Sequence, residues 1–191
     1  MFEVELKAHV DDRAHVIETL NSFAQYDDTV EKSDVYWGKM AGERKIQARI
    51  RTEKSTRGKK IFFTYKQKEL RVGEDGIQIE VNDEKECELL DSAPVEAFFS
   101  DLGLCVFLEK RKSVVGWHFE DAHIELCTVP PLGDFLEIEI LSGFNDETAV
   151  SAGREKIISL FARCGIGEEK IENRYYSEML RECGAAQTGE N

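Results

Sequence analysis

The first strand-forming segment of the chain constrains its fold most, because it separates ionised from apolar side chains. Within residues 2–8, Glu3, Glu5 and Lys7 alternate with apolar residues. Successive side chains of a strand point to opposite faces, so the three ionised residues share one face. Taken alone, the pattern is typical of a strand with one face in water. The same spacing returns at residues 135–141, where two glutamates alternate with aliphatic residues.

Basic residues show this alternation in other segments. Arg49 and Arg51 are separated by one isoleucine. Lys110 and Lys112 are also two residues apart, and Lys66 ends an aromatic segment. For any one pair, the alternative is a solvated strand face with cross-strand salt bridges. The repetition of such strands along one chain instead predicts a charged interior.

Hydrophobic periodicity and turn residues predict the elements of the fold. Strands are expected at about residues 2–10, 31–38, 45–52, 61–66, 106–117, 118–129 and 135–141, with one or two more within 77–90. Helices are expected at about residues 14–23, 95–102, 148–164 and 173–183. A polar, basic loop is expected at 53–60 and a turn region at 70–76.

Many strands with helices between them predict an α+β protein dominated by antiparallel sheet. Closing that sheet into a barrel would remove its edges and enclose a lumen. We expect the charged faces to point into this lumen and helices to pack against the outside. Residues 1–183 are expected to form a single domain, and residues 184–191 a disordered tail.

Composition limits the classes of partner. Thirty-eight acidic and 25 basic residues give a net charge of −13, which argues against binding nucleic acid through bulk electrostatics. No apolar segment approaches the roughly 20 residues that span a bilayer, so no membrane segment is expected. The five cysteines are odd in number and lack zinc-ligand spacing, and they are expected to be reduced thiols of a cytoplasmic protein.

The charged rows suggest binding of a metal and phosphates. Carboxylates two apart on a strand lie close enough to share a hard cation, and Mg²⁺ and Mn²⁺ prefer carboxylate oxygen. Glu3, Glu5, Glu137 and Glu139 therefore form a candidate metal site. Arginine binds phosphate as a planar fork and lysine as a point charge. The candidate phosphate-binding residues are Arg49, Arg51, Lys66, Lys110 and Lys112.

Six segments in order resemble one family. They are Glu3-Val4-Glu5-Leu6-Lys7, Arg49 with Arg51, Thr64-Tyr65-Lys66, Lys110-Arg111-Lys112, the segment from Leu132 to Glu139, and the segment from Arg174 to Leu180. Together they resemble the CYTH family, the triphosphate tunnel metalloenzymes, over about residues 2–180. The last segment is similar to the corresponding end of class IV adenylyl cyclases.

The resemblance implies an eight-stranded antiparallel tunnel that holds a triphosphate and one or two divalent metal ions, Mg²⁺ or Mn²⁺. Its implied metal ligands are Glu3, Glu5, Glu86, Glu125, Glu137 and Glu139. Its implied catalytic residues are Lys7, Arg49 and Arg51, which also bind substrate together with Lys66, Lys110, Lys112 and Arg174. Two positions depart from the family pattern: Cys127 stands where an aspartate is usual, and Lys112 where an arginine is expected.

The resemblance implies an enzyme acting on a triphosphate, with cyclisation of ATP to cyclic AMP and pyrophosphate as the leading expectation. The alternatives are a triphosphatase acting on tripolyphosphate or thiamine triphosphate, and a polyphosphate- or nucleotide-binding module without catalysis. A purely structural role is disfavoured, since a lumen of like charges costs stability unless a ligand uses it. An exposed face of the sheet leaves a homodimer open.

Overall fold

The computed structural model describes residues 2–42, 44–72, 78–142 and 146–184. Within these ranges, the side chains of residues 2, 44–45, 66–72, 78–84 and 142 lie outside the description. The strands are β1 (Phe2–His9), β2 (Gln25–Ala41), β3 (Arg44–Ser55), β4 (Gly58–Val72), β5 (Gln78–Leu89), β6 (Cys105–Phe119), β7 (Ala122–Val129) and β8 (Gly133–Ser142). The helices are α1 (Arg13–Asn21), α2 (Ala93–Asp101), α3 (Glu147–Arg163), the short 3₁₀ helix η1 (Glu168–Lys170) and α4 (Tyr176–Glu182).

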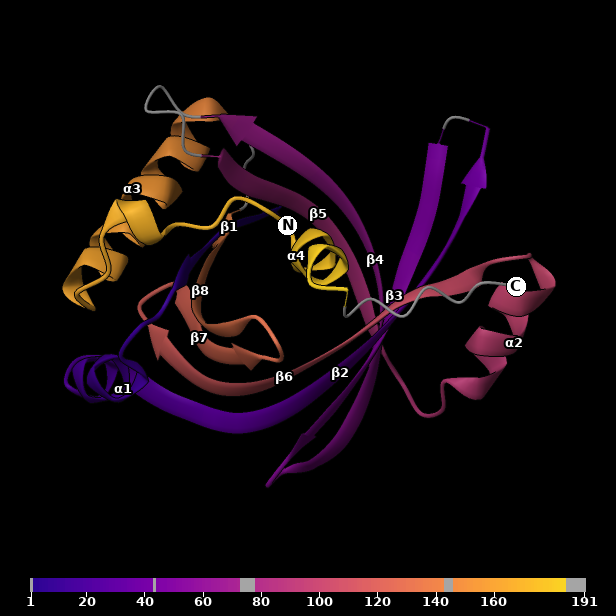
Figure 1. Ribbon diagram of the computed structural model, residues 1–191, viewed down its shortest axis with the longest axis horizontal. Coiled ribbons are helices and arrows are strands. Elements are labelled where there is room, and N and C mark those ends of the chain that lie inside the picture. Colours follow the sequence, from indigo (N-terminus) through magenta and orange to yellow (C-terminus); the bar gives the residue numbers. More distant parts are fainter. Residues whose placement is uncertain (1, 43, 73–77, 143–145, 185–191) are drawn as a thin grey trace.

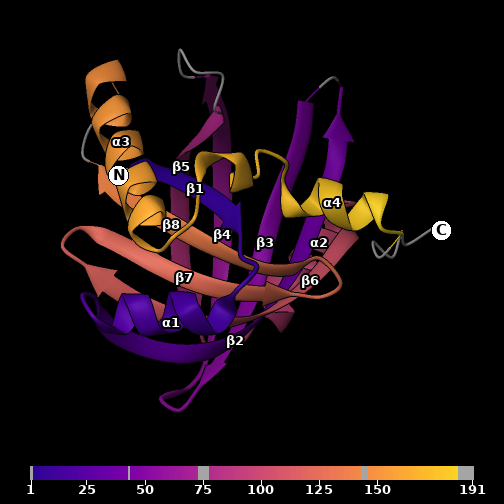
Figure 2. The ribbon, with the colours of Figure 1, turned by 60° about the vertical axis from the view of Figure 1, so that its left-hand side comes forward.

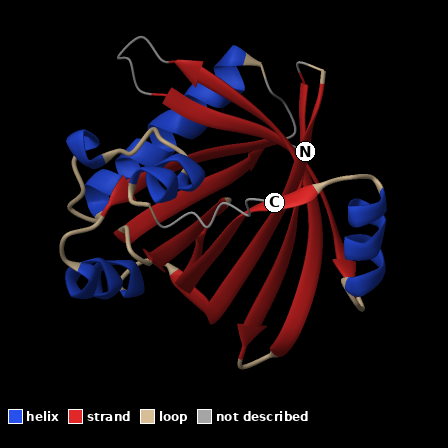
Figure 3. Ribbon diagram, turned by 45° about the vertical axis from the view of Figure 1, so that its right-hand side comes forward, coloured by secondary structure: helices blue, strands red, loops and turns tan. Residues whose placement is uncertain are grey.

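The strands form a closed antiparallel barrel in the order β1-β5-β4-β3-β2-β6-β7-β8 (Figure 1). Closure depends on β1, which pairs with β5 on one side and with β8 on the other. Helices flank the strands on the outside, as Figure 3 shows by colour. The predicted α+β barrel with flanking helices is therefore confirmed.

The largest hydrophobic core lies outside the barrel, between its wall and the helices. Val4 and Leu6 point outward from β1 and are buried against this core, to which α3 contributes Ile157 and Phe161. Figure 2 shows α3 lying along β1 and β8. The close approach depends on Gly153, where an added Cβ would stand 3.2 Å from Val4 Cγ1. Because the apolar faces are used outside, the ionised faces of the strands are left to line the interior.

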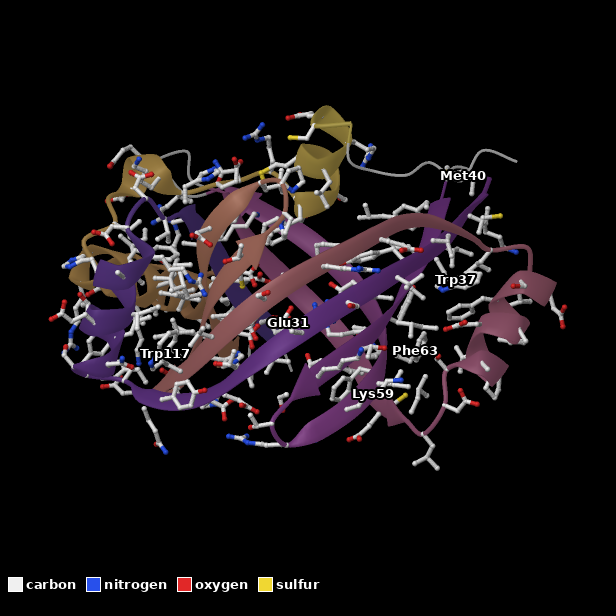
Figure 4. All side chains as sticks on the ribbon, turned by 60° about the horizontal axis from the view of Figure 1, so that its bottom comes forward. Glu31, Trp37, Met40, Lys59, Phe63 and Trp117 are labelled. Carbon is white, nitrogen blue, oxygen red and sulfur yellow. The ribbon has the colours of Figure 1, made fainter. Side chains whose placement is uncertain are left out.

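A smaller core secures α2 on the other side of the barrel. Phe99 of α2 packs against Trp37 and Phe63, with ring centroids 5.7 and 5.9 Å apart. Both partners lie on the barrel wall facing α2 (Figure 4). The helix thus covers the outer faces of β2 and β4.

Several predicted boundaries needed correction. The loop expected at residues 53–60 is wrong, because β3 continues to Ser55 and β4 begins at Gly58, so a tight hairpin replaces it. The expected strands at 31–38 and 61–66 extend to 17 and 15 residues. Residues 78–89 form a single strand, β5, while 73–77 lie outside the described residues. The helix expected at 173–183 starts only at Tyr176.

Two further findings concern the whole described chain. All five cysteines are described, and none is in a disulfide. Across the described residues, every helix is too short or too polar to cross a membrane.

Candidate active site

The barrel encloses a cavity of about 590 Å³ to which all eight strands contribute. Helix α4 adds part of the wall, and Figure 1 shows this helix lying over the middle of the ring of strands. The volume falls within the range of about 300–1,000 Å³ that is usual for small-molecule sites. The cavity is therefore large enough for a ligand of nucleotide size.

The structure brings most of the predicted site residues to this cavity. Its lining includes five of the predicted basic residues and all six predicted glutamates: Lys7, Arg49, Arg51, Lys110, Lys112, Glu3, Glu5, Glu86, Glu125, Glu137 and Glu139. The side chain of Lys66 lies outside the described residues. Arg174 is the exception: its half-exposed guanidinium bonds Glu172 and Glu182 outside the cavity, at 2.5 and 2.8 Å.

One group of acids sits on β1 and β8. Oxygen atoms of Glu3, Glu5 and Glu139 lie within 4.8 Å of one another. Glu5 is directly opposite Glu139 in the strand pairing, and Glu139 Oε1 also lies 3.0 Å from His123 Nδ1. Three carboxylates so placed are the donor set that Mg²⁺ or Mn²⁺ favours. This group therefore fits the metal implied by the resemblance.

The second acidic group surrounds a lysine. Lys112 Nζ lies 3.0 Å from Glu125 Oε2, 2.6 Å from Glu137 Oε2 and 3.4 Å from Cys127 Sγ. The other oxygen of Glu125 accepts a hydrogen bond from Lys32 Nζ at 2.5 Å. All these side chains are buried. The lysines thus bind carboxylates that sequence reasoning assigned to a metal.

The pKa values in this group follow from burial and charge. Burial alone would raise the pKa of Glu137, but Lys112 lowers it to about 2. Lys112 and Lys32 likewise outweigh burial and hold the pKa of Glu125 well below its usual range. Burial lowers the pKa of Lys112, yet the negative charges of Glu125 and Glu137 help to raise it well above its ordinary value. Burial, and then Glu137, raise the pKa of the Cys127 thiol, so this side chain is neutral near pH 7.

Glu137 also has one buried oxygen that Lys112 does not bond. Its Oε1 atom has no hydrogen-bond partner among the described residues. The phenolic oxygen of Tyr176 is also buried and lacks a hydrogen bond within the described part of the chain. Leaving buried polar atoms unsatisfied costs free energy, so groups of this kind are expected where a ligand completes the site.

Asp34 is a buried acid that contacts two cavity-lining residues, and sequence reasoning missed it. It accepts two hydrogen bonds from Arg51 and lies 3.1 Å from Lys110 Nζ. Burial alone would raise the pKa of Asp34, but Arg51 and Lys110 hold it well below the usual range. The signal was present in β2, where Lys32, Asp34 and Tyr36 alternate just as the glutamates of β1 do.

Helix α4 brings an aromatic ring against the basic wall. The ammonium groups of Lys7 and Lys110 lie 5.6 and 4.9 Å from the centroid of the Tyr176 ring. The ring also packs edge-on against Phe135, with centroids 5.1 Å apart. Burial, and then the Glu137 carboxylate, raise the pKa of Tyr176 well above its usual range. These contacts hold the start of α4 in place at the cavity.

Part of the cavity lining is apolar and aromatic. Tyr36 and Phe107 line it with their ring centroids 6.1 Å apart, and Leu108 and Phe62 add further apolar surface. Thr64 and Glu86 are hydrogen-bonded to each other at 2.7 Å beside Arg49. The cavity thus combines charged groups suited to phosphates with rings suited to an organic group.

Comparison with known proteins supports a family assignment and a shared fold. The model of the CYTH domain matches residues 1–176. No curated protein matches the chain significantly. The PH1819 protein of Pyrococcus horikoshii OT3 is 25% identical, with a TM-score of 0.76 over 95% of this chain and 99% of that one.

Two other solved structures share the fold at lower identity. A candidate adenylate cyclase from Vibrio parahaemolyticus is 18% identical, with a TM-score of 0.70 over 95% of this chain and 98% of that one. A candidate adenylyl cyclase from Hippeastrum, described as having a dominant triphosphatase activity, is 15% identical, with a TM-score of 0.56 over 95% of each chain.

Proposed function

The chain belongs to the CYTH family, and from this premise we propose that it is a metal-dependent enzyme that acts on a nucleoside triphosphate. The leading reaction is cyclisation of ATP to cyclic AMP and pyrophosphate. Hydrolysis of a triphosphate is the second candidate. The observation that carries the proposal is that one cavity joins an acidic group, a basic wall and aromatic rings.

The basic wall would bind the triphosphate. Lys7, Arg49 and Lys110 line the cavity from three different strands, so they can meet a chain of phosphates from several sides. Two hydrogen bonds to Asp34 hold the guanidinium group of Arg51 in place, so its positive charge has a fixed position at the cavity. Such preorganised cations stabilise the charge that develops on phosphoryl oxygens in the transition state.

The carboxylates of Glu3, Glu5 and Glu139 would hold Mg²⁺ or Mn²⁺. A bound divalent ion polarises phosphoryl oxygens and lowers the pKa of an attacking oxygen. Glu86 lies on β5, the strand that pairs with β1, and accepts a hydrogen bond from Thr64. In the cyclase reaction, the ribose 3′-oxygen would form a bond to the α-phosphorus, while the bond from that phosphorus to pyrophosphate breaks.

The aromatic part of the cavity favours a nucleotide over bare tripolyphosphate. The rings of Tyr36 and Phe107 can stack on a base, which ATP has and tripolyphosphate lacks. Hydrolysis stays the second candidate because the charged groups alone would bind tripolyphosphate. In that reaction water would attack the terminal phosphorus instead.

A product assay separates these functions. The purified full chain is incubated with ATP, and separately with tripolyphosphate, in the presence of Mg²⁺ or Mn²⁺, and the products are resolved by chromatography. Cyclic AMP with pyrophosphate is the expected result. Orthophosphate without cyclic AMP would establish the triphosphatase instead. Binding of ATP without turnover of either substrate would overturn the enzymatic proposal in favour of a binding module.

A further inference from the structure

The ammonium group of Lys112 fills the centre of the second acidic group. A lysine ammonium has three hydrogen-bond donors and accepts none. Three acceptors surround Lys112 Nζ at hydrogen-bonding distance: a carboxylate oxygen each from Glu125 and Glu137, and the sulfur of Cys127. The number and placement of these acceptors match the donors of one ammonium ion.

We propose that Lys112 is the permanent cation of this group, and that the cavity therefore binds one divalent metal ion per chain, at Glu3, Glu5 and Glu139. The inference rests on the proposed metal-dependent function and assigns its metal stoichiometry. Lys112 takes the place of a second metal ion, with a charge that does not depend on the metal concentration.

The two carboxylates at Lys112 already have cations beside them. Lys112 and Lys32 lie 2.5–3.0 Å from Glu125 and Glu137, and Lys32 also lies 3.4 Å from Glu53, which in turn pairs with Arg51. A divalent ion added here would bring its two positive charges against both ammonium groups in a buried place. Uncompensated buried charge is costly, so a second metal ion would first have to expel an ammonium group.

The donor atoms also disfavour a hard cation. Both oxygens of Glu125 are engaged, Oε1 by Lys32 and Oε2 by Lys112. Glu137 Oε1 is the one carboxylate oxygen of the two residues without a hydrogen bond among the described residues, and Cys127 adds only sulfur, so with Lys112 in place the group offers too few oxygens for Mg²⁺ or Mn²⁺. The group on β1 and β8 differs, since all three of its members are carboxylates. The two groups line the same cavity but hold different kinds of cation.

Counting bound Mn²⁺ by electron paramagnetic resonance tests the proposal without measuring turnover. The full-length protein is titrated with Mn²⁺, and the unbound ion is quantified. The wild type should bind one Mn²⁺ per chain. Lys112→Met removes the ammonium but keeps an unbranched apolar side chain, and it should bind two. The matched control is Lys110→Met, on the same strand and beside Asp34 instead, which should still bind one.

Two Mn²⁺ per wild-type chain would overturn the proposal, and so would a Lys112→Met protein that folds yet binds only one. If Lys112→Met does not fold, nuclear magnetic resonance of the lysine ammonium groups in the wild-type protein provides the test. A signal from the enclosed Lys112 ammonium should persist in saturating Mg²⁺, and its loss would show displacement by metal. Absence of turnover with one Mn²⁺ bound would count against the proposed reaction but not against this stoichiometry.

Discussion

Asp34 and Arg51 form a two-pronged ion pair across β2 and β3, with Arg51 Nε 2.7 Å from Oδ1 and Nη2 3.1 Å from Oδ2. The two residues are directly opposite in the strand pairing, and the Asp34 side chain has no exposed surface. This pair shows that the interior of the barrel supplies its own counter-ions. The basic wall proposed to bind phosphates is therefore built on fixed acids as well as on bases.

Replacing Asp34 by asparagine should destabilise the protein strongly. The change leaves Arg51 and Lys110 buried without their acid, and removal of one partner from a buried pair costs about 3–5 kcal/mol. Urea unfolding measures the difference in free energy. Asp101→Asn, an exposed change in α2, is the control and should stay within about 0.5 kcal/mol of the wild type. A similar small effect for Asp34→Asn would mean that the pair is dispensable.

Acid should destabilise the protein by protonating carboxylates buried inside the barrel. The folded-state pKa of Glu137 is about 2, and those of Asp34 and Glu125 are held well below their usual range. Because these values lie below the unfolded ones, the stability they give is complete above about pH 5 and is lost as the pH falls toward 2. Urea midpoints measured across this window should decrease with pH. A midpoint that is constant from pH 5 to 2.5 would contradict this expectation.

Glu5→Gln should weaken metal binding with little effect on the fold. The amide keeps the size of the side chain but removes a negative charge from the group of Glu3, Glu5 and Glu139. Loss of an outer-shell partner of a metal typically costs about 10–100-fold in affinity, so loss of a direct ligand should cost at least that much. Mn²⁺ affinity and metal-dependent turnover are both measured. Glu155→Gln, exposed on α3, is the control.

Phe107→Ala should distinguish nucleotides from inorganic triphosphates. Stacking of a base on an aromatic ring contributes about 1–3 kcal/mol, so affinity for ATP should fall about 5–150-fold. Affinity for tripolyphosphate, which has no base, should stay close to that of the wild type. Calorimetric titration with both ligands gives the comparison. Equal losses for the two ligands would place the base elsewhere.

Tyr176 should matter through its ring more than through its hydroxyl group. Tyr176→Ala removes the packing on Phe135 and the ring over Lys110, and is expected to cost about 3 kcal/mol. Tyr176→Phe keeps both contacts and removes a buried hydroxyl group that lacks a hydrogen bond among the described residues. Its stability should equal or exceed that of the wild type. Thermal unfolding of the two variants provides the test.

Much of this architecture was predictable from alternation alone. The alternation of Glu3, Glu5 and Lys7 with apolar residues predicts one charged face. In the structure this face lines the cavity, and the apolar residues between them belong to the core outside the barrel. The alternation could not say which acid would meet which base. Glu137 was predicted to bind metal from its spacing to Glu139, and Glu125 from the family resemblance, yet Lys112 binds both, because register across three strands decides these contacts.

Other features were hidden for different reasons. Asp34 and Lys32 lie in a segment where one aspartate or lysine looks like an ordinary surface residue, and only closure of the barrel buries them. Arg174 was predicted from the family resemblance to bind substrate, and the structure places it outside the cavity lining. There its guanidinium group forms ion pairs with Glu172 and Glu182. Strand pairing across the barrel decided the first case, and local ion pairs decided the second.

The seam between β1 and β8 has a consequence for how this protein reaches its active form. Glu5 and Glu139 are 139 − 5 = 134 residues apart in the chain, and they become neighbours only when β1 and β8 pair with each other. Contacts of such long range form slowly, because the loop between them must first be closed. The candidate metal site therefore spans the joint that completes the barrel. A divalent ion bound by residues of both strands would stabilise their pairing. The supply of the metal ion would then affect how long the barrel stays folded.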